Sequence, residues 1–386
     1  GWNDSSTVIT TRVGPNSNHY HYDQGSFQVM TNGDELLTDP GIGTLGYYAN
    51  LDYLIYNIQA IGHNVLLVDH DPESQTPADF DNGIAALRDW PHLTHSFAGK
   101  IADASEADLT DIYKNKLSTY HRTLLYTKTG PLFLFDQVKS SSSEGHVFDW
   151  LFHAPQNEHN QRSISYKDQR MLIDRPNARL TMDVVAPEIA SAVIRDRNDK
   201  NLPESYISLS SKPKLKDVDF LAVLFPEVKP ASGDRHTRAA TKRIDAEGWI
   251  GAQAEWGDKS YLGFFRTGSG ADANKVDDFV TDARRFTVSF SSKNVLQAIY
   301  FEGNNFEGKG LRITCPEPVT CAASFLGMST GIEVDIRKPS TLSVSVTRKP
   351  GKVMLDGSLS TNWKYAQDTK MISLQVPEGR HDFVLE

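Results

Sequence analysis

The chain has 386 residues, of which 23% are charged and 39% hydrophobic, and its formal net charge is -9. These values predict a folded chain of two or three domains with a packed core. The acidic balance argues against nucleic acid as the main partner, and no apolar run approaches the ~20 residues of a membrane span. An acidic substrate remains compatible with this charge, because a local basic pocket can attract it.

The first residues, Gly1-Trp2-Asn3-Asp4, lack the basic and apolar regions of a signal peptide, so we expect a mature or trimmed chain. The two cysteines, Cys315 and Cys321, would close a small loop in an exported protein. In a cytosolic protein they would remain free thiols. The sequence contains no CxxC pattern of the kind that binds zinc.

The pattern along the chain is that of β-structure, since short runs rich in β-branched and aromatic residues alternate with turn residues. In chain order we predict strands at residues 6–13, 26–30, 65–68, 121–127, 132–138, 148–153, 171–174, 180–185, 220–225, 261–266, 286–290 and 342–347. Asn32-Gly33 indicates a hairpin, because a type I′ turn needs positive φ at both central residues. The fold class expected is all-β, a large antiparallel β-sandwich with a small C-terminal β domain.

Helical segments are few in this reading. Residues 51–60 and 106–116 are predicted as short helices. The domain boundary is placed near residue 295, which gives a central β-sandwich over 1–295 and a C-terminal β module over 296–386.

The most informative stretch is residues 19–27, which read His-Tyr-His-Tyr-Asp-Gln-Gly-Ser-Phe. In an extended strand His19, His21 and Asp23 would share one face, because successive side chains point to opposite faces. Asp39 follows the next strand of the hairpin, and His63 precedes the apolar run at 65–68. Imidazole and carboxylate groups are zinc ligands, so the residues alone favour His21, Asp39 and His63 as a metal trio. The alternative is that these histidines are hydrogen-bonded polar groups at a sheet edge.

The register of the hairpin complicates this choice of ligands. A two-residue turn at Asn32-Gly33 places Asp39 opposite Ser26, on the face away from His21. A β-bulge near Gly25 would add one residue and restore the common face. Without that bulge, Asp23 becomes the favoured carboxylate ligand.

Three strings together resemble the heparinase II/III-like polysaccharide lyases: residues 19–27, residues 33–41 (Gly-Asp-Glu-Leu-Leu-Thr-Asp-Pro-Gly) and residues 63–69 (His-Asn-Val-Leu-Leu-Val-Asp). The family has Asn-Thr where this chain has Asn64-Val65. His121-Arg122, followed by a strand that ends in Phe135-Asp136, is similar to a further block of the family, with less specificity. The strong match covers about residues 10–70.

The resemblance implies a fold, a cofactor and a partner. Members of the family join an N-terminal helical toroid to a central β-sandwich and a small C-terminal β domain, and this chain resembles the last two parts. The resemblance assigns His19 to the active site, facing the uronate. It matches His21, Asp39 and His63 to the ligands of a zinc that is usually structural. A tyrosine and an asparagine or histidine of the family's toroid have no counterpart in this chain.

The implied activity is cleavage of a uronic-acid polysaccharide, such as a glycosaminoglycan or alginate, by β-elimination. A base removes the C5 proton and an acid protonates the leaving O4, while donors stabilise the charge that develops on the carboxylate. Tyr47, Tyr48, Tyr53 and Tyr56 are candidates for proton transfer, with Tyr53 and Tyr56 preferred, or else they pack the segment that carries them. The residues considered for substrate binding are Arg12, His121, Arg122 and His153.

Two other functions stay open on this sequence, a non-catalytic carbohydrate-binding β domain and a uronate epimerase, which begins with the same proton abstraction. A glycoside hydrolase is disfavoured, because it needs two carboxylates flanking the bond and no such pair stands out. The family resemblance implies a bacterial protein that is periplasmic or secreted. The expected partners are an acidic polysaccharide and the helical toroid, with no nucleic acid and no membrane span.

Overall fold

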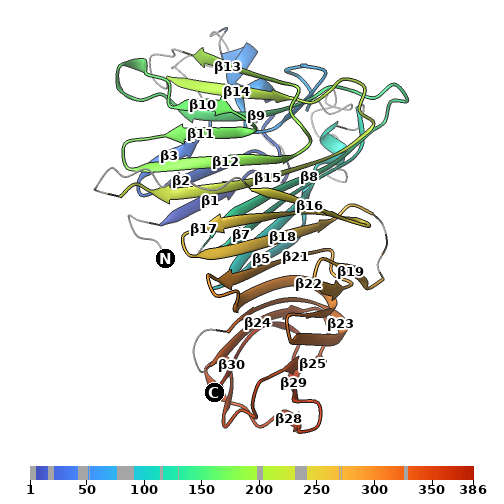
Figure 1. Cartoon of the computed structure of the whole chain (residues 1–386). Helices are drawn as coiled ribbons and strands as arrows, with labels where there is room; N and C mark the ends of the chain where they lie inside the picture. Colours follow the sequence, from blue (N-terminus) through green and yellow to red (C-terminus); the bar gives the residue numbers. More distant parts are fainter. Residues whose placement is uncertain are drawn as a thin grey trace. The chain divides into compact units, whose positions relative to one another are not determined.

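The computed structural model describes residues 6–15, 21–41, 51, 53–75, 91–113, 116–128, 130–197, 203–230, 241–268, 270, 272–325 and 329–386. Nearly all regular elements in these ranges are β-strands, which confirms the all-β fold class (Figure 1). The chain divides into two compact units. One comprises Gly1–Ser96, Ser105–Leu124 and Leu132–Thr237, and the other Phe97–Ala104, Leu125–Pro131 and Arg238–Glu386.

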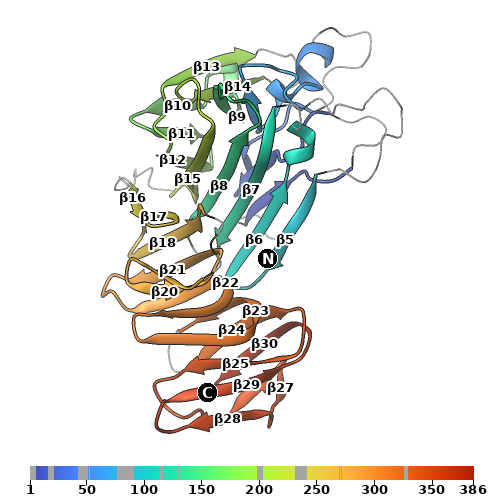
Figure 2. The same cartoon turned by 90° about the vertical axis from the view of Figure 1, so that its right-hand side faces the viewer.

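Three antiparallel sheets make up most of the first unit, and residues 97–98, 102–104 and 125–127 of the largest of these sheets belong to the second unit. A three-stranded sheet contains β1 (Thr7–Thr11), β2 (Phe27–Thr31) and β3 (Asp34–Leu37). An eight-stranded sheet has the order β10 (Ile164–Lys167), β11 (Arg170–Asp174), β12 (Ala178–Ala186), β15 (Asp217–Val228), β8 (Leu132–Ser140), β7 (Leu117–Thr127), β6 (Ala102–Asp108) and β5 (His92–Ala98), and its last four strands lie side by side in Figure 2. A four-stranded sheet has the order β13 (Ser191–Arg197), β14 (Glu204–Ser210), β9 (Phe148–Pro155) and β4 (Leu66–Val68).

The eight-stranded and four-stranded sheets pack face to face through large aromatic side chains. Trp150 of β9 stacks on Phe220 of β15 with ring centroids 4.4 Å apart, and Phe152 lies 6.4 Å from the same ring. All three side chains are at most 1% exposed. Burying such side chains stabilises the fold by about 1.5–3 kcal/mol each, so this contact forms the core of the predicted β-sandwich.

The second unit contains a fifteen-stranded antiparallel sheet. Its main order is β16 (Lys242–Ala246), β17 (Trp249–Trp256), β18 (Lys259–Arg266), β21 (Arg285–Ser291), β22 (Leu296–Gly308), β23 (Leu311–Ser324), β24 (Thr330–Ile336), β30 (Gly379–Leu385), β26 (Val353–Leu355) and β27 (Ser358–Leu359), with β19 (Asn274–Val276), β20 (Phe279–Thr281), β25 (Ser340–Ser345), β28 (Trp363–Ala366) and β29 (Met371–Val376) beside this path. Cys315 and Cys321 are buried free thiols of β23. The predicted boundary at residue 295 falls between the paired strands β21 and β22, and the division into 1–295 and 296–386 stays a prediction.

Apart from Leu51, which is helical, the helical structure in the described residues consists of short turns, η2 (Tyr53–Asn57, a π-helical turn), η3 (Ala60–Gly62), η5 (Thr110–Tyr113) and η6 (Glu158–Asn160). The helix predicted at residues 51–60 is therefore represented by η2 and the start of η3. The helix predicted at 106–116 is wrong, because β6 continues to Asp108 and only η5 follows. Pairing of β6 beside β7 overrides the helical tendency of its alanines and acidic residues. No helix in the described ranges is long and apolar enough to cross a membrane.

The hairpin predicted at Asn32-Gly33 is confirmed, with positive φ at both residues and Thr31 paired with Asp34. Met30 pairs with Glu35, but Val29 then pairs with Leu37, so Leu36 is an extra residue in β3. The structure thus contains a bulge that adds one residue to the hairpin, as predicted. The bulge lies in β3, whereas the prediction placed it near Gly25, before β2. Because one inserted residue reverses the alternation of side chains, the segment that follows Leu37 lies one residue out of the register that the two-residue turn alone would give.

Candidate functional site

The segment that carries His21 and Asp23 is a turn, which corrects the prediction of a strand there. Strand β2 begins only at Phe27, and the backbone N–H of Ser26 donates to the carbonyl of Asp23 at 2.9 Å. Gly25 has φ +80°, a value that favours glycine and that interrupts extended structure. The argument from alternating faces therefore does not apply to His21 and Asp23.

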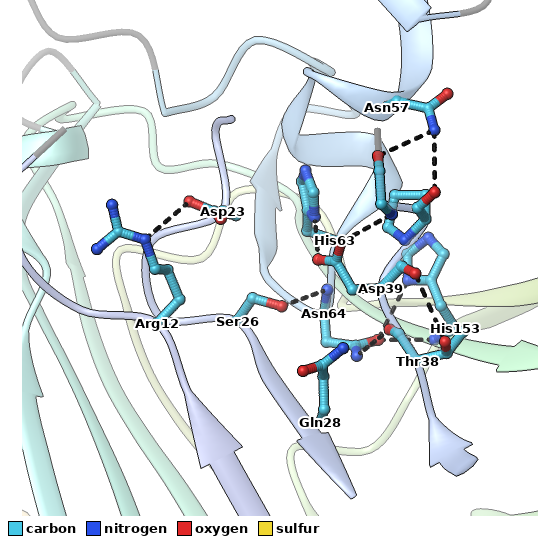
Figure 3. A network of polar contacts seen from close by, with 12 residues as sticks. Arg12, Asp23, Ser26, Gln28, Thr38, Asp39, Asn57, His63, Asn64 and His153 are labelled. Carbon is cyan, nitrogen blue, oxygen red and sulfur yellow. Dashed lines mark hydrogen bonds and ion pairs between the residues drawn. The ribbon is translucent and has the colours of Figure 1, made fainter. Parts of the chain in front are cut away.

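His21, Asp39 and His63 nevertheless lie together. One ligand atom from each of them lies within 4.8 Å of the other two. Nδ1 of His63 is 2.8 Å from Oδ2 of Asp39, and the His21 and His63 ring centroids are 5.3 Å apart. The expected grouping of these three side chains is confirmed, and they come from the turn before β2, the segment after β3 and the segment before β4. Figure 3 shows Asp39 and His63 facing each other.

Backbone and amide groups hold the Asp39 carboxylate in place. The N–H of Gly41 donates to Oδ1 of Asp39 at 2.9 Å, while Oδ2 faces His63. The Asn57 side chain of η2 donates to the carbonyls of Pro40 and Gly41 at 3.1 and 3.2 Å (Figure 3). These hydrogen bonds attach the segment after β3 to η2.

The electrostatics of the group favour an ionised Asp39 beside His63. Burial opposes the charge on Asp39, but the hydrogen bond and charge of His63 outweigh it and lower the pKa of Asp39. Burial likewise opposes protonation of His63, but its contacts with Asp39 and the charge of Asp23 outweigh this and raise the pKa of His63. Burial, followed by the charge of His63, lowers the pKa of His21 to about 4. At neutral pH the His21 imidazole is therefore neutral, the form that binds metal.

Asp23, the alternative carboxylate ligand, lies outside this trio. Its Oδ1 is 3.9 Å from Nε of Arg12 and is buried without a hydrogen bond. Burial raises the pKa of Asp23, while the charges of His63 and Arg12 oppose the shift. The geometry therefore selects Asp39 over Asp23.

Asn64 connects the strands beneath the trio. Its Nδ2 donates to the carbonyls of Phe27 and Thr38 at 2.8 and 2.9 Å, and its Oδ1 accepts from the backbone N–H of His153 at 2.7 Å. Its own backbone N–H donates to Oγ of Ser26 at 3.2 Å. One amide side chain, 1% exposed, thereby ties β2, the end of β3 and β9 to the segment that carries His63.

Arg122, one of the residues predicted to bind substrate, lies in the interior at 3% exposure. Its Nε and Nη2 form a bidentate pair with Asp136 at 2.8 and 2.7 Å. Its Nη1 donates to the carbonyls of Gly25 and Asn64, both at 2.8 Å. This guanidinium supports the loops of the site from below and does not face solvent.

The other three predicted substrate residues differ in exposure. His153 is fully buried, with Nε2 3.0 Å from the carbonyl of Ile61, and burial lowers its pKa to about 3. Arg12 is exposed and contacts Asp23. His121 is partly exposed on β7, and its Nε2 is 4.0 Å from Asp108.

The structure describes only some of the residues that the sequence predicts to be catalytic. His19, Tyr47 and Tyr48 lie outside the described residues, and of Tyr53 only the backbone, in η2, is described. The Tyr56 hydroxyl is buried beneath the surface. Its ring lies 3.8 Å from the Arg197 guanidinium carbon and 6.2 Å from the His153 ring.

One acidic residue beside the site gave no signal in the sequence. Glu204, at the start of β14, is 1% exposed, and neither of its carboxylate oxygens makes a hydrogen bond of normal geometry among the described residues. Burial, followed by the charge of Glu204, raises the pKa of Tyr56. Burial also raises the pKa of Glu204 itself, to about 7. Only the pairing of β13, β14 and β9 brings it there, so no local motif identifies it.

Comparison with known proteins gives a family match and fold matches. The family model described as heparinase II/III-like, C-terminal, matches residues 2–258, which is 257 of the 386 residues. A comparison with curated protein sequences gives no match. Among solved structures, a crystal structure of heparinase III is 16% identical with a TM-score of 0.53, covering 69% of this chain and 40% of that chain. The heparan sulfate lyase HepC from Pedobacter heparinus is 14% identical with a TM-score of 0.50, covering 69% of this chain and 39% of that one.

At these identities the solved structures establish a shared fold, and this chain spans about two fifths of their length. The family assignment comes from the sequence model, whose match contains the sandwich and the His21–Asp39–His63 group. The chain belongs to the heparinase II/III-like family, of which it carries the C-terminal β region.

Proposed function

We propose that this chain is the β-sandwich part of a polysaccharide lyase that cleaves uronic-acid polymers by β-elimination. The observation that carries the proposal is the grouping of His21, Asp39 and His63 within a chain of the heparinase II/III-like family. The titles of the similar structures name heparinase III and a heparan sulfate lyase. These support a glycosaminoglycan as substrate, with alginate as the other uronate polymer to be tested.

The trio fits a zinc ion. Two imidazoles and one carboxylate are ligands that zinc accepts, and the neutral state of His21 and the ionised state of Asp39 suit binding. His21, Asp39 and His63 would hold the ion between three segments of the chain. Zinc there would supply a structural cross-link, since Asn57 and Asn64 already position the same segments around it.

In the proposed reaction a base takes the C5 proton of the uronate, the C4–O4 bond breaks, and an acid protonates the leaving O4, so that a 4,5-unsaturated uronate forms. His19 is assigned to the uronate carboxylate, where a donor would stabilise the developing charge. Tyr53 remains a candidate for proton transfer. Tyr56 is less suited to direct proton transfer, because its hydroxyl is buried.

The proposed substrate contacts are Arg12 and His121, which are at least partly exposed. Arg122 and His153 act in this proposal as buried supports of the loops, because neither side chain reaches solvent. The remaining catalytic groups are assigned to a helical toroid domain as partner. A bacterial periplasmic or secreted location would place the protein with such polymers.

The test is incubation of this chain, alone and joined to a helical toroid domain, with heparin, heparan sulfate, chondroitin sulfate and alginate. Ultraviolet absorbance of the unsaturated uronate reports cleavage. We expect activity on at least one polymer in the joined protein, and its loss in His19→Ala with zinc content unchanged. A polymer that is bound but not shortened would favour a carbohydrate-binding domain, and inversion at C5 without cleavage would favour an epimerase. No reaction with any polymer in the joined protein would refute the lyase proposal.

A further inference from the structure

A groove of about 640 Å³ lies on the four-stranded sheet of the first unit, on the face opposite the sandwich core. Its walls and floor come from β4, β9, β14, β13 and the segments beside them, and Figure 1 shows β13, β14 and β9 side by side. None of its lining residues belongs to the His21–Asp39–His63 group. The residues that line the groove include His70, Asp149, Val193, Arg195, Ser208 and Ser210.

Strand register explains why these side chains share one face. Asp149 pairs with Ser210, Ser210 with Ser191, and Ser208 with Val193. Cross-strand partners point to the same side of a sheet, so hydroxyl, carboxylate and apolar groups form rows across the strands. Neighbouring strands lie about 4.8 Å apart, so the face extends roughly 14 Å from β4 to β13, about the length of a short oligosaccharide.

The floor of the groove contains a buried carboxylate. Asp149 is 1% exposed, and its Oδ1 accepts from the Ser210 hydroxyl at 2.5 Å. Its Oδ2 lies 2.8 Å from Nδ1 of His70, whose side chain is 66% exposed. A buried carboxylate is costly unless it is paired, and here an exposed imidazole pairs with it at the rim. The rest of the His70 ring, including Nε2, is left accessible to a ligand.

A guanidinium lies at the other end of the groove. Arg195 of β13 is exposed, and its guanidinium carbon lies 5.9 Å from the ring centroid of Tyr206. None of the described residues forms an ion pair with Arg195. Val193, 40% exposed on the same strand, adds an apolar surface to the groove. The groove thus combines one exposed guanidinium, several hydroxyls and exposed apolar side chains.

We propose that this groove binds a short stretch of an anionic saccharide. Arg195 would pair with a carboxylate or sulfate, the exposed Ser191 would bind a sugar hydroxyl, and Val193 would contact the apolar face of a ring. Sugars present hydroxyl and C–H surfaces together, which matches the mixture of groups on this face. A guanidinium forms bidentate hydrogen bonds with carboxylate and sulfate groups, so the charge selects acidic over neutral sugars.

Binding of defined tetrasaccharides to this chain tests the inference by calorimetry, without any need for turnover. The probes are a heparin tetrasaccharide, an oligogalacturonate tetrasaccharide that carries carboxylates only, and neutral cellotetraose. We expect one or both acidic probes to bind and cellotetraose to bind at least tenfold more weakly. Arg195→Gln should weaken acidic binding tenfold or more, since it removes the charge-assisted hydrogen bonds of the guanidinium.

The matched control is Lys167→Gln, which removes one exposed positive charge from β10 and should bind like the original chain. Hydrogen exchange should show protection of β13 and β14 on binding. No acidic binding, equal affinity for cellotetraose, or unchanged affinity in Arg195→Gln would overturn the inference. The groove inference rests on the proposed function only in its choice of an acidic polysaccharide as ligand. A His21→Ala variant should keep groove binding, so a failure of the lyase proposal can be distinguished from a failure of the groove inference.

Discussion

Oδ2 of Asp39 lies 2.8 Å from Nδ1 of His63, although 24 residues separate the two in sequence. The contact joins the segment after β3 to the segment before β4, and His21 completes the group from the turn before β2. A metal held by these three segments would couple its binding to the fold, because the unfolded chain cannot present the three groups together.

Replacing His21 should therefore remove the metal. We expect about one zinc per chain in the purified protein and a loss in His21→Ala, as measured by plasma mass spectrometry. The melting temperature should fall with the metal, since a ligand that binds only the folded state stabilises it by mass action.

His121→Ala is the control for this loss, because His121 lies on β7 outside the group. It should keep both the zinc and the melting temperature. Equal zinc content in His21→Ala and the original chain would remove His21 as a ligand.

Loss of the Arg122 guanidinium should destabilise the first unit strongly. Arg122→Met leaves the Asp136 carboxylate, which is 0% exposed, with only two neutral donors among the described residues, the Tyr120 hydroxyl and the Trp150 indole N–H. Breaking a buried pair in this way costs about 3–5 kcal/mol, measurable by urea unfolding at pH 7.

The comparison variant is Arg162→Met, which breaks the exposed ion pair with Asp196. Exposed pairs contribute roughly 0–1 kcal/mol, so this variant should unfold close to the original chain. Similar losses in both variants would contradict the structural role given to Arg122.

Glu204 should make stability depend on pH. Burial raises its pKa from 4.5 to about 7 in the folded chain, so folding binds a proton and stability falls as pH rises from 4.5 through 7. At pH 8 the ionised carboxylate penalises the folded state by on the order of 3 kcal/mol. Glu204→Gln should therefore be more stable than the original chain at pH 8 and nearly equal to it at pH 4.

Urea unfolding at pH 4, 6 and 8 measures this difference. Glu188→Gln serves as control, because Glu188 is exposed and paired with Lys212 at the surface. A difference between Glu204→Gln and the original chain that stays constant with pH would show that the pKa of Glu204 is the same in the folded and unfolded chains, and it would contradict the raised pKa.

Much of the site could be predicted from sequence because its signals are local. Asn32-Gly33 specifies its own turn, and the donor types of His21, Asp39 and His63 indicate a ligand set. The strand drawn through His21 and Asp23 was wrong, since Gly25 at positive φ breaks it. Alternation of aromatic and polar residues does not distinguish an irregular turn from a strand.

The remaining parts depend on contacts between distant strands. Glu204 approaches Tyr56 only through the pairing of β13, β14 and β9. The burial of Arg122 depends on Asp136 one strand away and on carbonyls from two other segments. No spacing rule in the sequence predicts such contacts. The sequence alone therefore predicts Arg122, next to His121, as a residue that binds substrate.

The extra residue Leu36 in β3 has a consequence for a shortened hairpin. Leu36 and Leu37 are neighbours and both are 0% exposed, because the bulge interrupts the alternation of side chains between the two faces. Deleting Leu36 would leave Leu37 paired with Val29 in a continuous ladder, so Asp39 would keep its register while the core lost one apolar side chain. The cost of the deletion would therefore fall on stability more than on the grouping of the three polar side chains.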